Sequence, residues 1–320
     1  MKKNKIKNTG LEVTELSFGT SSLGSMPDTY GYEVPEERAQ ETLKRFFKGP
    51  VNLLDTSRNY AMGESEKRIG IAIKENGGWP ENFVLSTKID RNMDTLVLDK
   101  KRTRESIEES LKTLNVDSVD ILFLHDPEYV KDINDITKKD GAMDELFKIK
   151  EEGLAKAVGL AMGKIDIMFP MLKKWDFDVI INHNRYTLLN READEMYSYA
   201  HSKNISIFNA APYAGGVLAK GPSNFKKITY QDASEEKLAP AREIEKVCKK
   251  YNVEMGAAAL QFSMKDKRIT STICGVTSVN SIEKTLAWAE TDIPEEFWNE
   301  VLKLPYSTKD PESERIFTPG

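Results

Sequence analysis

The sequence is poor in the residues and runs that mark several protein classes. Its 320 residues hold only two cysteines, Cys248 and Cys274, which cannot form a disulfide framework and favour a reducing compartment, the cytoplasm. No apolar run approaches the ~20 residues that span a bilayer, so no membrane partner is expected. The formal net charge of −5, without a long Lys/Arg run, argues against a nucleic-acid partner.

Common catalytic and phosphate-binding motifs are missing too. No G-x-G-x-x-G follows a predicted strand, no P-loop occurs, and no G-x-S-x-G elbow is present. The three histidines, His125, His183 and His201, do not pair at the spacing of metal ligands, so no metal is expected. The basic N-terminus lacks a following apolar segment and is not typical of a secretory signal.

The composition is that of a folded protein. Hydrophobic residues make up 39% of the chain and charged residues 30%, which excludes a disordered tail and supplies a core. A chain of this length often forms two domains of ~150 residues, but an α/β barrel of ~250 residues or more is a single domain. Because no linker or low-complexity tract interrupts the sequence, we expect one domain over residues 1–320.

Eight short apolar runs predict the strands of that domain. Each run is nearly continuous rather than alternating, which is typical of parallel strands that are covered on both faces. Apolar residues recur at helical spacing between the runs, as for Ala39, Leu43 and Phe46. Eight β–α units of ~40 residues predict an α/β fold, a (β/α)8 TIM barrel. The runs are 16–20, 51–55, 83–88, 119–125, 155–161, 178–182, 205–210 and 269–275.

Other segments lie outside a minimal barrel. Residues 5–14 predict an N-terminal β-hairpin that turns at Asn8-Thr9-Gly10 and closes one end of the barrel. Residues 211–233 form a long Gly-containing loop after the seventh strand, and long loops in compact domains are usually functional. A helix is expected to start near Pro240 and to run through Tyr251. An extended C-terminal tail follows over residues 304–320.

Titratable residues end three successive predicted strands. Asp55 ends the second strand, Lys88 the third and His125 the fourth, and Tyr60 follows in the loop after Asp55. Each residue alone has an ordinary structural explanation: a helix cap, an ion pair, a buried donor or a loop aromatic. Their combination in neighbouring units favours a site, because the carboxyl ends of barrel strands form the active sites of such folds.

The chemistry of these four residues is specific. A free Tyr has a pKa of ~10, and a nearby ammonium stabilises its phenolate by up to about 4 kcal/mol at an effective dielectric of ~20. Asp55 would orient Lys88, and His125 would bond the reacting oxygen beside Tyr60. The arrangement predicts a proton relay at a carbon–oxygen centre. A Lys88 Schiff base is an alternative, although Asp55 disfavours it by keeping the ammonium charged.

Three segments resemble the signature blocks of the aldo-keto reductase superfamily: NLLDTSRNYAMGESEKRIG, FVLSTKID and DSVDILFLHDPE. The resemblance extends over residues 5–290. Within the superfamily the chain resembles the bacterial group that includes D-threo-aldose 1-dehydrogenase, L-fucose (galactose) dehydrogenase and pyridoxal 4-dehydrogenase. It implies a (β/α)8 barrel that transfers hydride between NAD or NADP and a small-molecule sugar or aldehyde. It also implies a catalytic tetrad in which Tyr60 is the general acid and base: Asp55, Tyr60, Lys88 and His125.

The resemblance also implies where the cofactor binds. The loop around Gly215 would cover the pyrophosphate, and the segment around Thr277 would hold the adenosine end. Many family members have a basic residue near Thr277, and here Lys284 is the nearest base, which slightly favours NAD over NADP. The implied cofactor-binding residues are Gly19, Thr20, His183, Tyr213, Gly215, Gly216, Leu218, Gly275, Val276, Thr277, Ser278, Asn280 and Lys284.

The chain differs from many family members at the positions expected to contact the nicotinamide ring. Ala161-Met162 replaces a Ser-Asn pair after the fifth strand, and His183 or Asn182 replaces a Gln after the sixth. Ala210 stands where an aromatic ring usually stacks, with Tyr213 three residues later.

Two alternative functions stay open: a general aldehyde reductase of the same family, and a nucleotide-binding sensor with slow turnover. Substrate specificity is expected in four segments, 21–33, 126–139, 211–231 and 304–320. No heptad or apolar surface stripe indicates an oligomeric state.

Overall fold

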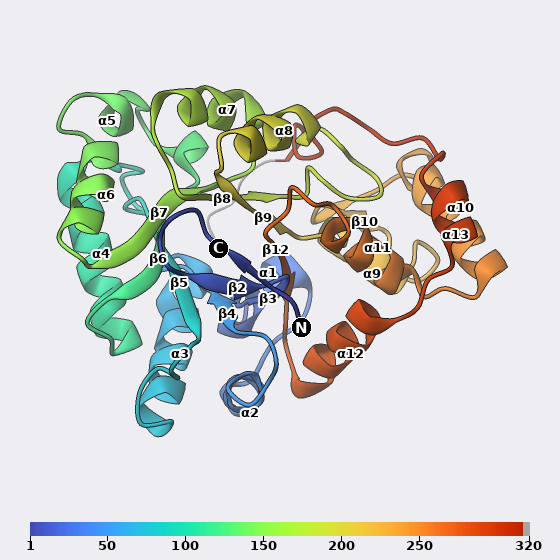
Figure 1. The fold of residues 1–320 in the computed structure, drawn as a ribbon, viewed down its shortest axis with the longest axis horizontal. Coiled ribbons are helices and arrows are strands. Elements are labelled where there is room, and N and C mark those ends of the chain that lie inside the picture. Colours follow the sequence, from blue (N-terminus) through green and yellow to red (C-terminus); the bar gives the residue numbers. More distant parts are fainter. Residues whose placement is uncertain (316–320) are drawn as a thin grey trace.

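The computed structural model describes residues 1–315 and contains a closed barrel of eight parallel strands (Figure 1). The order around the barrel, β12-β3-β4-β5-β6-β7-β8-β9, follows the chain, so each strand pairs with the next one along the sequence. This confirms the predicted (β/α)8 barrel. The strands are β3 (Leu16–Gly19), β4 (Leu53–Asp55), β5 (Val84–Ile89), β6 (Val119–His125), β7 (Ala155–Met162), β8 (Val179–His183), β9 (Ser206–Ala210) and β12 (Ser271–Gly275).

The larger helices lie around the outside of the strands (Figure 1). Ala39, Leu43 and Phe46 are buried on one face of α2, as their spacing predicts. Glu64 and Glu66 lie in the first turn of α3, as expected; the partly exposed Glu64 interacts favourably with the helix dipole, whereas Glu66 is buried. These helices are α2 (Glu36–Phe46), α3 (Glu64–Glu75), α4 (Lys100–Leu114), α6 (Ala142–Glu151), α7 (Ile165–Lys174), α8 (Asp194–Ser202), α10 (Glu235–Tyr251), α11 (Met255–Met264), α12 (Val279–Glu290) and α13 (Glu295–Val301).

The apolar strands bury both faces in two separate cores. Along β6, Ile121 and Phe123 belong to the cluster inside the barrel, whereas Leu122 and Leu124 pack outward under the helices. Phe123 meets Phe208 of β9 across the interior, with ring centroids 6.3 Å apart. Alternation between two apolar environments explains why the strands read as continuous apolar runs.

The N-terminal hairpin closes one end of the barrel, as predicted. Strands β1 (Lys3–Lys5) and β2 (Glu12–Thr14) pair antiparallel, with Lys3 opposite Thr14. The intervening turn lets Ile6, Leu11 and Val13 join the barrel's inner cluster. The hairpin therefore fills the end of the barrel opposite the predicted site.

The prediction that a helix starts at Pro240 is wrong. Helix α10 begins at Glu235, and Pro240 lies inside it. The side chain of Ser234 accepts a hydrogen bond from the backbone N–H of Lys237 at 3.3 Å, so Ser234 is the N-cap. A proline this near the N-terminal end removes only one intrahelical hydrogen bond, which the cap and the packing of Leu238 and Ala241 offset.

Short elements occupy the connections at the mouth of the barrel. The predicted loop 211–233 contains a helical turn at η4 (Ala214–Gly216), helix α9 (Val217–Lys220) and a small hairpin of β10 (Lys227–Ile228) and β11 (Gln231–Asp232). No helix among residues 1–315 is long and apolar enough to cross a bilayer. The remaining short helices are η1 (Ser21–Gly24), α1 (Pro27–Tyr30), η2 (Tyr60–Gly63), η3 (Pro127–Tyr129) and α5 (Asn134–Thr137).

Candidate active site

The three strand-terminal residues meet at one end of the barrel. Asp55 ends β4, Lys88 is the last residue but one of β5, and His125 ends β6. Parallel pairing brings these neighbouring strand ends together, and Tyr60 follows in η2. All four residues line one cavity of about 720 Å³ at the mouth of the barrel.

The Lys88 ammonium links the group together. Its Nζ lies 2.7 Å from Oδ2 of Asp55, 2.6 Å from the carbonyl oxygen of Thr56 and 3.0 Å from the hydroxyl of Tyr60. An ammonium has three N–H donors, and all three are used here. The other Asp55 oxygen accepts a hydrogen bond from Ser86 at 2.7 Å. Lys88 is therefore held as a cation, which argues against the Schiff-base alternative.

Tyr60 lies in a strained turn over this ion pair. The next two residues, Ala61 and Met62, adopt left-handed conformations with φ of 50° and 54°. The turn packs tightly on η1, where a Cβ on Gly24 would lie 2.6 Å from that of Ala61. The Tyr60 ring meets His125 edge-on, with centroids 5.8 Å apart. The strained turn thus aims the phenol into the site.

The electrostatics of Tyr60 differ from the sequence expectation. Burial raises the pKa of the Tyr60 phenol well above its usual value, and the carboxylates of Asp55, Asp126 and Asp90 add to that rise. The expected lowering of this pKa by Lys88 does not prevail, because Asp55 lies 2.7 Å from the ammonium and offsets its charge. Tyr60 is therefore a phenol at neutral pH, the form that donates a proton.

His125 lies between two carboxylates that the four-residue pattern did not include. Its Nδ1 is 2.6 Å from Oδ1 of Asp90, and its Nε2 is 3.7 Å from Oδ1 of Asp126. Burial by itself lowers the pKa of His125, but Asp126 and Asp90 outweigh burial, so the pKa is raised. The sequence did carry a signal for Asp90, since a carboxylate directly after a strand is the feature that identified Asp55.

The predicted cofactor residues fall into two groups. Those that line the mouth cavity are Gly19, His183, Tyr213, Gly215, Gly216, Gly275, Thr277 and Lys284. The others do not line this cavity. Thr20 bonds the carbonyl oxygen of Asp55 at 2.9 Å, Leu218 and Val276 are buried, and Ser278 caps α12, with Asn280 in its first turn.

The structure distinguishes the two residues considered for the nicotinamide side. Asn182 donates hydrogen bonds to the carbonyl oxygens of Met162 and Gly163, both at 2.9 Å, and is buried. His183 lines the cavity instead, together with Ala161 and Ala210.

The opposite side of the cavity suits a phosphate-containing cofactor. Lys220, Lys227 and Lys284 line it and supply positive charge. Gly215 and Gly216 adopt positive φ angles of 74° and 119°, which favour glycine. Their backbone packs closely against the next segment of the loop, since a Cβ on Gly215 would lie 2.8 Å from the backbone nitrogen of Tyr230. The residues present therefore fit a nicotinamide dinucleotide spread across the mouth, although the chain lacks the usual glycine fingerprint.

A C-terminal segment, residues 307–315, is fastened across the mouth. The buried Arg185 guanidinium lies 2.9 Å from Oε1 of Glu312 and 2.5 Å from Oδ1 of Asp310. Burial opposes ionisation of Glu312, but His183 and Arg185 outweigh it and hold the pKa of this carboxyl well below its usual value. Glu312 and Arg315 line the cavity. Arg185 and Glu312 were missed because the pair is distant in sequence.

All four segments predicted to set specificity contribute to the cavity wall. They supply residues such as Tyr30 from 21–33, Asp126 and Tyr129 from 126–139, Tyr230 from 211–231, and Glu312 and Arg315 from the tail. The last part of the predicted tail, residues 316–320, lies outside the described residues.

The fold and this site belong to a known class of enzyme. The chain is a member of the aldo-keto reductase family, whose aldo/keto reductase model matches residues 15–304. Enzymes of this family are NAD(P)-dependent oxidoreductases that act on small molecules, which confirms the resemblance seen in the sequence.

Individual relatives are moderately similar. The chain is 31% identical to L-galactose dehydrogenase from Arabidopsis thaliana over 88% of this chain and 85% of that protein. It is 25% identical to pyridoxal 4-dehydrogenase from Microbacterium luteolum, over 92% and 95%. A solved aldo-keto reductase from Bacillus halodurans in its holo form has a TM-score of 0.78 at 21% identity, covering 99% of this chain and 100% of that one. That structural likeness shows the fold alone.

Proposed function

We propose that this enzyme transfers hydride between a nicotinamide cofactor and C1 of an aldose. The observation that carries the proposal is the Lys88 ammonium, which contacts both the Asp55 carboxylate and the Tyr60 hydroxyl at the floor of the mouth cavity. A general aldehyde reductase and a slow-turnover nucleotide sensor are the competing functions.

The four residues have separate tasks in this proposal. The nicotinamide, when bound, donates hydride to the reacting carbon or accepts it. In reduction the Tyr60 hydroxyl donates its proton to the substrate oxygen, and the nearby Lys88 cation stabilises the phenolate that forms. Asp55 keeps Lys88 protonated and oriented. His125 provides a second polar contact for the reacting oxygen, and in oxidation each transfer runs in reverse.

The remaining cavity wall supports a polyhydroxylated substrate. Asp126 offers a carboxylate that accepts hydrogen bonds from sugar hydroxyls, and Arg315, one Nη of which bonds Glu312 at 2.8 Å, offers further donors. Tyr30 and Tyr129 add aromatic surface beside these groups. The similarity to L-galactose dehydrogenase adds support for an aldose.

We infer a slight preference for NAD over NADP. Thr277, at the adenosine end of the proposed site, carries no charge, and Lys284 is drawn toward Trp288, with Nζ 4.7 Å from the ring centroid. A 2′-phosphate would therefore lack a basic fork. We also infer that residues 1–320 act as one domain in the cytoplasm, where free, buried Cys248 and Cys274 would stay reduced.

Absorbance of the reduced nicotinamide during turnover tests the proposal. NAD and NADP are each offered with L-galactose, L-fucose, D-arabinose and pyridoxal, and the reduced cofactors with simple aldehydes. We expect reduction of NAD by an aldose. Turnover of aldehydes alone would show a general reductase, and cofactor binding without turnover would show a sensor.

Tyr60→Phe tests the assigned acid and base. The variant should lose about two to four orders of magnitude in turnover while it still binds the cofactor, because only the proton-transferring hydroxyl is removed. Tyr199→Phe makes the same change on α8, away from the residues that line the cavity; it is the matched control and should turn over normally. Near-normal turnover by Tyr60→Phe would refute the assignment.

A further inference from the structure

Asp90 is fixed from several directions directly behind His125. One carboxylate oxygen, Oδ1, lies 2.6 Å from Nδ1 of His125. The other, Oδ2, accepts hydrogen bonds from the Ser57 hydroxyl at 2.6 Å and from the backbone N–H of Asn59 at 2.9 Å. The side chain is buried, so this carboxylate cannot turn away to solvent.

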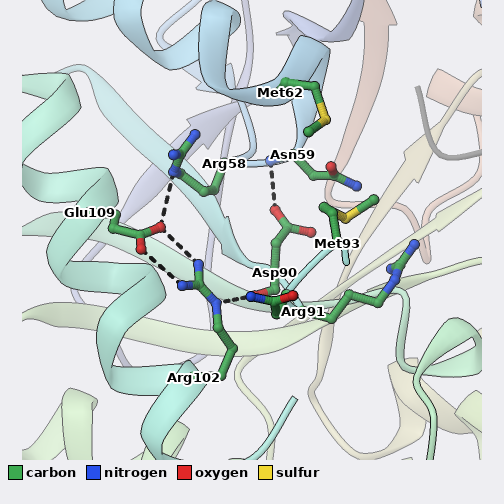
Figure 2. Close-up of a pocket in the computed structure, with 9 residues that line it drawn as sticks. Arg58, Asn59, Met62, Asp90, Arg91, Met93, Arg102 and Glu109 are labelled. Atoms are coloured by element: carbon green, nitrogen blue, oxygen red, sulfur yellow. Dashed lines mark hydrogen bonds and ion pairs between the residues drawn. The ribbon is translucent and has the colours of Figure 1, made fainter. Parts of the chain in front are cut away.

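The main chain of Asp90 is fixed as well. Figure 2 shows Asp90 in a second cavity, of about 150 Å³, with Asn59 on one side and Arg102 on the other. Nε of Arg102 donates to the Asp90 carbonyl oxygen at 3.1 Å, while its two Nη atoms bond Glu109 at 2.9 and 2.8 Å. Nε of Arg58 also bonds Glu109 at 3.2 Å, so this carboxylate neutralises part of the arginine charge around the second cavity.

We propose that Asp90 is a positioning residue, which accepts a hydrogen bond from the Nδ1–H of His125 and thereby directs Nε2 of the ring to the reacting oxygen of the substrate. The inference rests on the proposed function. It follows from the two ring nitrogens: a hydrogen bond at one nitrogen decides which tautomer the neutral ring adopts. The neutral ring then presents a lone pair to a substrate hydroxyl, and the charged ring presents an N–H to a substrate carbonyl.

Four ionisable groups surround the ring. Asp90 and Asp126 favour its charged form, and Lys88 and burial oppose it. The fourth, Tyr60, meets the ring edge-on. With Asp90 ionised, the site therefore places two donors at the substrate oxygen during reduction, the Tyr60 hydroxyl and His125 Nε2–H. Asp90 would control the second donor without touching substrate.

Nitrogen-15 NMR of the histidine rings tests the proposal without substrate. The chain has three histidines, so His125→Asn identifies the His125 signals by their loss. In the parent protein Nδ1 should stay protonated when the ring becomes neutral. In Asp90→Asn the pKa of His125 should fall by about one unit or more, because an adjacent opposite charge is lost. Asp94→Asn removes an exposed carboxylate nearby and should leave the titration unchanged.

Kinetics supply the second measurement. Asp90→Asn should lower kcat/KM for reduction roughly ten- to a hundredfold and shift its alkaline decline to lower pH, whereas Asp94→Asn should do neither. A neutral ring that carries its proton on Nε2 would overturn the proposal, as would an unchanged pH profile in Asp90→Asn. Because the tautomer test uses only the parent spectrum and the His125→Asn assignment, a misfolded Asp90→Asn leaves that test intact. Near-normal turnover by Tyr60→Phe would instead refute the proposed function.

Discussion

Glu66 links the stability of the barrel to pH. The side chain is fully buried between α3 and β5, where its Oε1 accepts a hydrogen bond from Thr87 at 2.6 Å. Burial raises the pKa of this carboxyl from 4.5 to about 7, although Thr87 and Ser110 oppose the rise. Each unit of pKa corresponds to ~1.4 kcal/mol, so ionised Glu66 costs the folded protein about 3 kcal/mol.

The sign follows from proton binding. The folded protein binds the Glu66 proton more tightly than the unfolded chain, so the stabilising contribution is complete below about pH 4.5. It is lost as the pH rises to about 7 and stays lost above that. Glu66→Gln keeps an oxygen for Thr87 and removes the titration. The variant should match the parent near pH 4.5 and exceed it by about 3 kcal/mol at pH 8.

Urea unfolding at several pH values, followed by the fluorescence of the four tryptophans, measures this difference. The informative quantity is the change in unfolding free energy between variant and parent, since pH effects elsewhere cancel. Glu108→Gln makes the same chemical change at an exposed position on α4 and should stay within about 0.5 kcal/mol of the parent at each pH. A difference for Glu66→Gln that does not vary with pH would refute the reasoning.

Two further predictions concern the reaction. Because the pKa of Tyr60 is raised well above its usual value, the initial rate of aldose oxidation should climb from neutral pH through the accessible alkaline range without a plateau; a flat rate–pH profile would contradict Tyr60 as the base. Thr277→Arg adds a basic fork at the adenosine end and should improve the kcat/KM ratio of NADP over NAD by about tenfold. An unchanged ratio would place the 2′-position elsewhere.

Local sequence predicted the barrel well because its strands bury both faces. Strand β6 matches its predicted run, 119–125, since its five apolar residues each belong to either the inner or the outer cluster. The predicted start of a helix at Pro240 was wrong for a local reason too. The side chain of Ser234 caps the helix, so it begins at Glu235, and its second turn tolerates Pro240.

Only the part of the site that lies at the ends of the strands was predictable from the sequence. Asp55, Lys88 and His125 could be placed together because consecutive parallel strands end at the same mouth. The protonation state of Tyr60 could not be predicted, because it depends on burial and on how closely Asp55 offsets Lys88. Contacts between residues distant in sequence, such as Arg185 with Glu312, leave no local pattern.

The fastening of residues 307–315 also bears on how the protein matures. The tetrad is encoded before residue 126, and β12, which closes the barrel, ends at Gly275. All barrel strands therefore precede Asp310 and Glu312 in the chain, and until residues 307–315 dock on the barrel Arg185 has neither of these two carboxylates. The charge then keeps only the more distant Glu192 carboxylate, 3.8 Å from its Nε, and a buried charge that lacks its close partners is destabilising. The wall of the substrate cavity formed by residues 307–315 is therefore expected to be stabilised after the barrel, when these residues bind Arg185.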